Sequence, residues 1–309
     1  MKRYILFGAL IATCSATASA VQQVEQRVPS NHANGKVEIV IGEGSVHVIG
    51  WNKNEVEVTG TLGDRVERLD VRKGNRKVRV RAYLPKEGTA READLIVYAP
   101  HNNDIDVQVF QGPIVVTGIE GDMELETFSG DISVAGLCKR VEARTVNGDI
   151  TVDSAKTNAG ADKVRAKSVA GAIIIKNVRR EVEAQSISGA VTITGNSLNK
   201  VAVETVSGDV RFDGGLSQLG RLEIDTHDGE IIGVFPAELS AEFDITSFNG
   251  DVNNAFNPSS GKNQEVIQSE GDLQAEVKAT SFSGNIRVNK RAQGKVVKAP
   301  AADPKTSVE

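Results

Sequence analysis

The sequence predicts an all-β protein, a single-chain β-solenoid of about 18–21-residue repeats with an N-terminal β cap, and two observations support this. A six-residue phrase, clearest as Thr127-Phe-Ser-Gly-Asp-Ile132, returns in varied copies until close to the C-terminus. Apolar and polar residues alternate on both sides of its glycine, as they do in strands with one buried face. Because no single repeat has enough apolar surface to close a core, successive repeats must stack on one another.

The central glycine of each repeat marks a predicted corner between two strands. Thr or Ser stands three residues before it in the eight well-formed copies, and we expect these hydroxyls to point inward and satisfy backbone groups. A mostly apolar residue two before the glycine breaks the alternation, which indicates a bulge. The glycine then supplies a backbone conformation that a side chain would resist. The predicted corners are Gly112, Gly130, Gly148, Gly171, Gly189, Gly208, Gly229, Gly250 and Gly284.

The first 20 residues have the three parts of a secretory signal peptide. Lys2 and Arg3 precede an apolar run from Tyr4 to Thr13, and small residues lead to an expected cleavage site after Ala20. The apolar run is too short to span a bilayer, and no later stretch approaches the roughly 20 apolar residues of a membrane helix. We therefore expect an exported protein, periplasmic or extracellular. A lipoprotein anchored at Cys14 is the alternative, although Thr13 stands where a lipobox has Gly, Ala or Ser.

Charge and composition limit the classes of ligand. Without residues 1–20 the chain has 36 − 2 = 34 Lys and Arg against 41 Asp and Glu, a net charge of −7, which disfavours nucleic acid as a partner. Aromatic residues make up 4%, which argues against a sugar-binding groove built from stacked rings. Cys138 is the one cysteine after the signal peptide, so we expect a structural thiol and no intramolecular disulfide.

The remaining boundaries follow from changes in pattern along the chain. A polar segment with Pro29 predicts a flexible leader, and short β-branched runs that lack the repeat phrase predict the cap. The long gap between Gly250 and Gly284 indicates an inserted loop plus coil. The predicted segments are a signal peptide (1–20), a flexible leader (21–35), an N-terminal β cap region (36–108), solenoid repeats (109–288) and a disordered tail (289–309).

These residues carry a family resemblance. Gly50-Trp51, followed by Glu55-Val-Glu-Val-Thr-Gly60 and then by repeated Thr-Val-Ser-Gly-Asp-Val phrases, resembles the bacterial putative-adhesin family of β-strand-repeat domains of unknown function. The resemblance covers roughly residues 37–288. It implies the repeat fold and brings no catalytic motif, so no functional residue is carried over from it.

The acids that follow several corner glycines form a candidate metal site. Asp209, Glu230 and Asp251 belong to consecutive copies of the phrase, and we expect them to stack in a column. Like charges about 5 Å apart repel by roughly 0.8 kcal/mol even in water, and a divalent cation such as Ca²⁺ would relieve this. In the alternative reading each acid is solvated and hydrogen-bonds its own turn. No cofactor is expected.

His227 lies in the one local cluster with acid–base potential, together with Asp225, Asp228 and Glu230. Polysaccharide lyases and hydrolases built on β-solenoids place such groups on their coils. His227 also occupies the slot filled by Phe128 and its equivalents in other repeats, which predicts a packed corner residue instead.

The densest basic stretch lies in the cap region and consists of Arg72, Lys73, Arg76, Lys77, Arg79 and Arg81. It suits contact with an acidic envelope polysaccharide, and equally a charged edge strand that discourages aggregation.

The function that these features favour is an exported, non-enzymatic β-repeat protein, an adhesin or a binding or structural scaffold of the cell envelope. Its expected partners are envelope or surface glycans or another envelope protein. The alternative is a polysaccharide-acting lyase or hydrolase with a site around His227.

Overall fold

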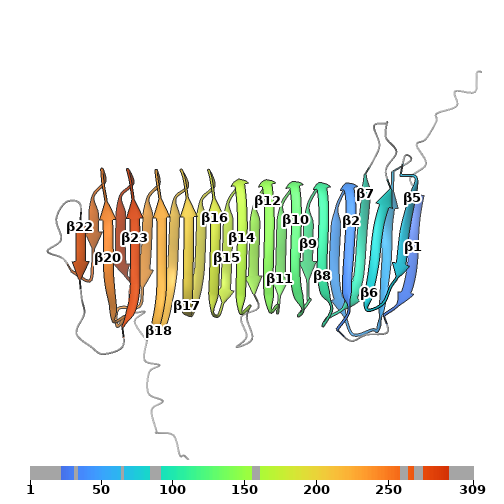
Figure 1. Ribbon diagram of the computed structural model, residues 1–309, viewed down its shortest axis with the longest axis horizontal. Helices are drawn as coiled ribbons and strands as arrows, with labels where there is room; N and C mark the ends of the chain where they lie inside the picture. The colour runs from blue at the N-terminus through green and yellow to red at the C-terminus, as the bar shows by residue number, and fades with distance from the viewer. Residues whose placement is uncertain are drawn as a thin grey trace, which may run out of the picture.

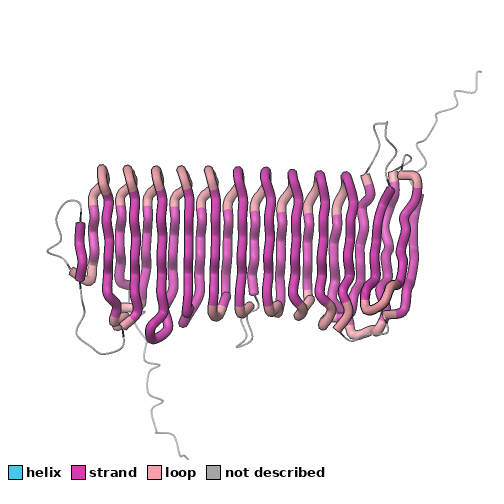
Figure 2. Tube along the Cα trace, viewed as in Figure 1, coloured by secondary structure: helices cyan, strands magenta, loops and turns pink. Residues whose placement is uncertain are grey.

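The computed structural model describes residues 22–30, 34–63, 66–83, 92–154, 161–257, 264–267 and 274–291. Within these residues the regular structure consists of β-strands, with no helix. The strands stand side by side along one long axis (Figure 1), and the chain path repeats as a regular series of coils (Figure 2). The predicted all-β solenoid is therefore confirmed. The expected signal peptide, with Cys14, lies outside the described residues.

Two parallel sheets enclose the core. The first sheet contains the strands that precede the corners: β8 (Asp104–Gln111), β10 (Asp122–Ser129), β12 (Arg140–Asn147), β14 (Lys163–Ala170), β16 (Glu181–Ser186), and the C-terminal parts of β17 (Val191–Thr205) and β18 (Val210–Thr226). The second sheet contains the strands that follow them: β9 (Ile114–Thr117), β11 (Ile132–Gly136), β13 (Ile150–Ser154), β15 (Ile173–Val178), the N-terminal parts of β17 and β18, and β19 (Ile231–Phe235).

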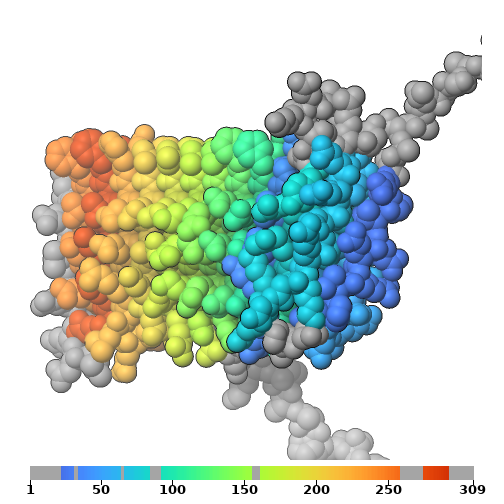
Figure 3. All heavy atoms as spheres, turned by 45° about the vertical axis from the view of Figure 1, so that its right-hand side comes forward, coloured from blue at the N-terminus to red at the C-terminus, as the bar shows by residue number. Residues whose placement is uncertain are grey.

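Equivalent residues of successive coils pair directly, so each side chain has copies of itself as neighbours. Leu125, for example, lies between Val107 and Ala143. Inward-pointing Val, Ile, Leu and Ala stack in buried columns that form one core, and side chains on the surface also lie in rows along the stack (Figure 3). Each coil buries its apolar face only against its neighbours, which is why the repeats need one another to fold.

The N-terminal end contains one more coil than the repeat phrase predicts. β2 (Lys36–Glu43) and β3 (Val46–Trp51) pair in parallel with β8 and β9 and turn at Gly44. The prediction that residues 36–108 form only a cap is therefore wrong for this coil. Its apolar residues have the spacing of the other repeats, but Ile41 replaces the Thr or Ser, which hides the phrase.

The other N-terminal strands close the stack. β6 (Lys77–Tyr83) and β7 (Ala93–Pro100) pair in parallel with β2 and β3. β5 (Arg68–Lys73) and β4 (Glu55–Leu62) pair antiparallel with β6 and β7, and β1 (Gln22–Pro29) pairs antiparallel with β4. The flexible leader predicted for residues 21–35 is therefore wrong for β1, whose residues all pair with β4. These antiparallel strands end the parallel ladders.

At the C-terminal end the coils do not follow chain order. β20 (Ala241–Ser247) and β21 (Val252–Asn254) form an outer coil. β23 (Ala275–Ser281) and β24 (Ile286–Lys290) lie between it and the coil of β18 and β19. β22 (Gln264–Ile267) pairs antiparallel with β20.

The chain that crosses from the outer coil back to the inner one accounts for the 34-residue gap between the last two predicted corners. Two predictions are corrected here, the order of the corners and the start of the tail. In space the corner of Gly284 lies between those of Gly229 and Gly250. The tail predicted for residues 289–309 begins too early, because β24 continues to Lys290. Residues 292–309 lie outside the described residues.

Close approach of the corners is the common reason for glycine. A Cβ atom on any of the nine predicted corner glycines would lie 1.7–2.3 Å from the carbonyl oxygen of the glycine in the adjacent coil. Four of them, Gly112, Gly130, Gly148 and Gly171, also adopt the predicted backbone conformation that a side chain would resist, with φ values of 139–153°. From Gly189 onward φ lies outside the left-handed range, and only the contact excludes a side chain.

The Thr and Ser side chains before the corners are buried, as expected, and all of them except Thr226 hydrogen-bond the backbone. Thr127, Thr145 and Ser168 donate to the carbonyl oxygen of the adjacent coil's glycine at 3.1–3.2 Å. Ser186 and Thr205 accept instead from the N–H of their own corner glycine, at 2.9 and 3.0 Å. The hydroxyls thus stabilise the corner either between coils or within one coil.

Ion pairs join neighbouring coils on the outer face of the first sheet. Arg165 bonds Glu183 at 2.9 Å, and Lys163 bonds Glu181 at 2.8 Å. The hydrogen bond from Arg165 lowers the pKa of Glu183, and the hydrogen bond from Lys163 lowers the pKa of Glu181. These side chains are about one-third exposed or more, so solvent weakens each pair.

Gly189→Ala should destabilise the protein by about 1–3 kcal/mol or more, because the new methyl group would meet the carbonyl of Gly171. Gly215→Ala is the matched control, since its nearest contact would be an ordinary 3.6 Å. Urea denaturation measures both free energies of unfolding. Equal stabilities for the two variants would contradict the account of the corner.

Thr145→Val should cost about 0.5–1.5 kcal/mol, the net value of a typical hydrogen bond. Thr226→Val provides the control, because the Thr226 hydroxyl is equally buried but has no hydrogen-bond partner among the described residues. We expect that control to unfold at the wild-type denaturant concentration. A larger loss in Thr226→Val than in Thr145→Val would contradict the assigned role.

Arg165→Gln should lower the melting temperature at pH 7, by the equivalent of about 0.2–1 kcal/mol for a partly exposed pair. Because the pKa of Glu183 is lowered in the folded state, this stabilisation is complete above 4.5, the unperturbed pKa, and is lost as the pH falls through the lower folded value. The difference from wild type should therefore shrink towards pH 3. Arg179→Gln, with no ion pair among the described residues, should show no such pH dependence.

Candidate functional site

The residues two before the corner glycines form a ridge along the stack, which we call the corner ridge. Its large apolar members at seven of the nine positions are 41–66% exposed, and Val146 is half-buried. Such a continuous row of exposed apolar side chains is typical of an interaction surface. In spatial order the corner ridge consists of Phe110, Phe128, Val146, Val169, Ile187, Val206, His227, Phe282 and Phe248.

The ridge is not predicted from the sequence, because the apolar residue two before each glycine indicates a bulge there. In the structure the alternation continues: Thr127 points inward and Phe128 points outward, and the same holds in the other coils. The signal was present in the sequence, since an apolar residue stands in the polar phase of the strand in repeat after repeat. Side chains held at the strand spacing of about 4.8 Å then meet along the stack.

Aromatic rings occupy both ends of the corner ridge and stack on one another. Phe110 and Phe128 lie 5.2 Å apart at 7°, and Phe248 and Phe282 lie 5.2 Å apart at 8°. His227 meets the ring of Phe282 edge-on at 4.8 Å. His227 therefore fills the predicted corner slot, but this slot is exposed and not packed inside.

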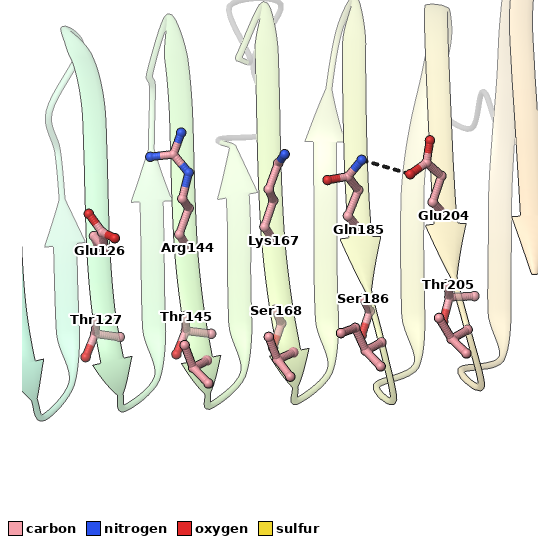
Figure 4. A pocket seen from close by; sticks show the side chains of 14 residues that line it. Glu126, Thr127, Arg144, Thr145, Lys167, Ser168, Gln185, Ser186, Glu204 and Thr205 are labelled. Carbon is pink, nitrogen blue, oxygen red and sulfur yellow. Dashed lines mark hydrogen bonds between the residues drawn. The ribbon is translucent and has the colours of Figure 1, made fainter.

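Two connected grooves run beside the corner ridge. One has a volume of about 510 Å³, the other about 600 Å³, and both are lined by Glu204 and Thr205. Figure 4 shows the first groove, in which a row of polar side chains rises from successive strands beside the row of Thr and Ser. The polar row consists of Glu126, Arg144, Lys167, Gln185 and Glu204. Its positive residues lie between negative ones, so the groove has no uniform charge.

The acid column is interrupted, contrary to the prediction. Asn285 lies between Glu230 and Asp251, so the three predicted acids do not occupy successive coils. The Asp209 carboxylate accepts the backbone N–H of Glu230 at 2.9 Å, and the Glu230 carboxylate pairs with Arg287 at 2.7 Å. Within the described part of the chain there is no group of three His, Cys, Asp or Glu with the geometry of a metal site. These acids therefore join one coil to the next.

The candidate acid–base cluster is divided between surfaces. Asp225 and His227 line the larger groove. Asp228 accepts a hydrogen bond from the Ser283 hydroxyl at 2.9 Å, and Glu230 is held by Arg287. Neither Asp228 nor Glu230 is among the residues that line that groove.

Three of the six residues of the basic stretch pair with acids of their own region. Lys77 and Arg79 both bind Glu38, and Arg72 binds Asp70 at 2.7 Å. The prediction of a charged edge strand holds for β5. It does not hold for β6, which lies between β2 and β5.

Cys138 is buried against the Ser154 hydroxyl, 3.6 Å from its sulfur, and burial raises the pKa of its thiol. This is the environment of a structural thiol. In the described residues no helix is long and apolar enough to cross a membrane.

Three solved structures are similar to this chain at low sequence identity. A putative adhesin from Bacteroides fragilis is 13% identical, with 86% of this chain and 97% of that chain covered and a TM-score of 0.45. A putative cell adhesion protein from Clostridium sporogenes is 10% identical, with 88% and 100% covered and a TM-score of 0.24. A putative lipid binding protein from Parabacteroides distasonis is 10% identical, with 87% and 97% covered and a TM-score of 0.39.

Among curated proteins no match was found. Residues 33–289 match the family described as Toastrack DUF4097, which includes every coil of the solenoid. This agrees with the resemblance that the repeat phrase carries. The chain therefore belongs to the Toastrack DUF4097 family.

Proposed function

We propose that the protein is an exported, non-enzymatic scaffold of the cell envelope that binds a protein partner along the corner ridge. The observation that carries this proposal is the continuity of the ridge, which places exposed side chains at eight of nine stacked corners and the half-buried Val146 at the ninth. A ridge of this length suits a long, complementary surface better than a small molecule.

The chemistry of the ridge favours protein over glycan. Sugar binding uses the free faces of aromatic rings, but in the pair Phe110–Phe128 and in the pair Phe248–Phe282 each ring has one face turned to its partner. The middle of the ridge, around Ile187, is aliphatic and offers no hydrogen bonds to hydroxyl groups. Exposed Val, Ile and Phe side chains are instead buried well by another protein surface.

The non-enzymatic part of the proposal is supported by the separation of the candidate acid–base groups. Of the four, only Asp225 and His227 line the groove, and Glu230 is neutralised by Arg287. Catalysis of glycosidic cleavage needs an acid and a base on opposite sides of the bond, whereas Asp225 and His227 stand two residues apart on the same outward side of one coil.

A photo-crosslinking residue tests the proposal in cells. With p-benzoylphenylalanine in place of Val206, irradiation should give an adduct in the envelope fraction that protease degrades, because the ridge contacts a protein. Its yield should fall at least about tenfold in a Phe248→Ser/Phe282→Ser background, since two anchoring rings are lost.

The matched control places the same crosslinker at Leu219, which is 67% exposed and lies away from the ridge. Equal adducts from both positions, or an adduct with a glycan, would contradict the proposal. Turnover of envelope polysaccharide that is lost in His227→Ala would contradict its non-enzymatic part.

A further inference from the structure

The corner ridge has the same chemistry when it is followed from either end. Ile187 belongs to the fifth of the nine corners that form the ridge, and a valine lies on each side of it. The corner at Gly44 adds no side chain to the ridge, because Gly42 stands two residues before it. Two phenylalanines form each end. Reversing the ridge therefore places Val169 opposite Val206, Val146 opposite His227, Phe128 opposite Phe282, and Phe110 opposite Phe248.

The polar row beside the ridge changes sign under the same reversal. Its members stand four residues before the corner glycines, and the central one is Gln185. Reversal places Lys167 opposite Glu204 and Arg144 opposite Asp225. The next two positions carry Glu126 and Gln108, which fall opposite Thr280 and Thr246. No pair of like charges arises in this row.

We propose that the protein partner is a second copy of this chain, bound antiparallel along the corner ridge with the two-fold axis beside Ile187 and Gln185. This rests on the proposed function and names its partner. A two-fold interface brings the same surface of both copies together, so the surface must be complementary to itself. Since both copies have the same coil spacing, the match at the axis holds from coil to coil along the ridge.

Other arrangements of two copies are less favourable. A parallel arrangement in equal register would turn the polar row of each copy towards the opposite side of the other copy's ridge, so Lys167 would not face Glu204. Moving the antiparallel axis half a coil towards the N-terminus would place Glu126 opposite Asp225. Like charges that face each other across an interface cost several kcal/mol, which disfavours that register. Moving the axis half a coil towards the C-terminus brings no like charges together but leaves one pair of opposite charges, Lys167 with Asp225, where the register at Gln185 has two.

The neighbours of the ridge permit this approach. The residues between the ridge and the corner glycines are mostly small and polar, such as Ser188 and Ser207. Lys167 has no ion pair within the described residues, and Glu204 is bound only by the neutral Gln185, at 2.9 Å. Arg144 already contacts Glu142 and Glu124 on its own sheet, so it would share its charge with Asp225 of the other copy.

Analytical ultracentrifugation with a charge exchange tests the register. Wild-type protein should be a dimer at about 100 μM, where a micromolar complex is filled. Lys167→Glu should weaken dimerisation at least about tenfold, because it faces Glu204. The double variant Lys167→Glu/Glu204→Lys should restore it, and Lys176→Glu on the second sheet should leave it unchanged. A monomeric wild type, or a double variant as weak as the single one, would overturn the proposal.

Cysteine crosslinking tests the orientation independently of these variants. Ile187→Cys lies at the axis and should form a covalent dimer on oxidation, whereas Phe110→Cys should not, because the two copies of residue 110 would be about 38 Å apart. Crosslinking at residue 110 and not at 187 would overturn the antiparallel arrangement.

The mass of the photo-adduct formed at residue 206 separates this inference from the proposed function. An adduct of twice the mass of the chain supports both. An adduct with a different protein overturns this inference and leaves the proposed function intact.

Discussion

The contact on which the rest of the structure depends is that between glycines of successive corners. A carbonyl oxygen lies where each corner residue would carry its Cβ, at 1.7–2.3 Å, so only glycine lets the coils approach to strand spacing. At that spacing both sheets keep their parallel hydrogen bonds, and the inward side chains close their columns. A single larger residue in this column would separate two coils on both faces of the core.

The same spacing creates the surface that we assign to binding. Every coil repeats its conformation, so an outward side chain beside the corner meets its equivalents in the neighbouring coils. The polar row of Glu126 to Glu204 arises in the same way. In a solenoid the residue type at one position of the repeat therefore determines a row of side chains as long as the stack. The charge of the polar row changes sign along the stack, while the ridge is mostly apolar. Together they give the surface a preferred partner and a preferred direction of binding.

Much of the fold could be predicted from sequence because the residues around Gly130 and its equivalents indicate the corner, the two flanking strands and the buried hydroxyl. The coil at Gly44 escaped prediction because Ile41 removes the hydroxyl, although the apolar spacing is unchanged. The position of Gly284 could not be predicted, since periodicity gives the number of coils and not their order in space. For the same reason the acids at Glu230 and Asp251 were expected side by side, and Asn285 separates them. The ridge was missed because apolar side chains such as Phe128 were assigned to a bulge and not to the outer surface.

The order of the corners at the C-terminal end is the direct test of this account, because the contacts between corner glycines place Gly284 between Gly229 and Gly250, against their order in the chain. Double electron–electron resonance between spin labels at Val169→Cys and at either Phe282→Cys or Phe248→Cys measures that order. Unlabelled protein is added so that only distances within one chain contribute. The account predicts about 19 Å to residue 282 and about 24 Å to residue 248, four and five strand spacings. The opposite order, with residue 248 nearer to residue 169 than residue 282, would contradict it.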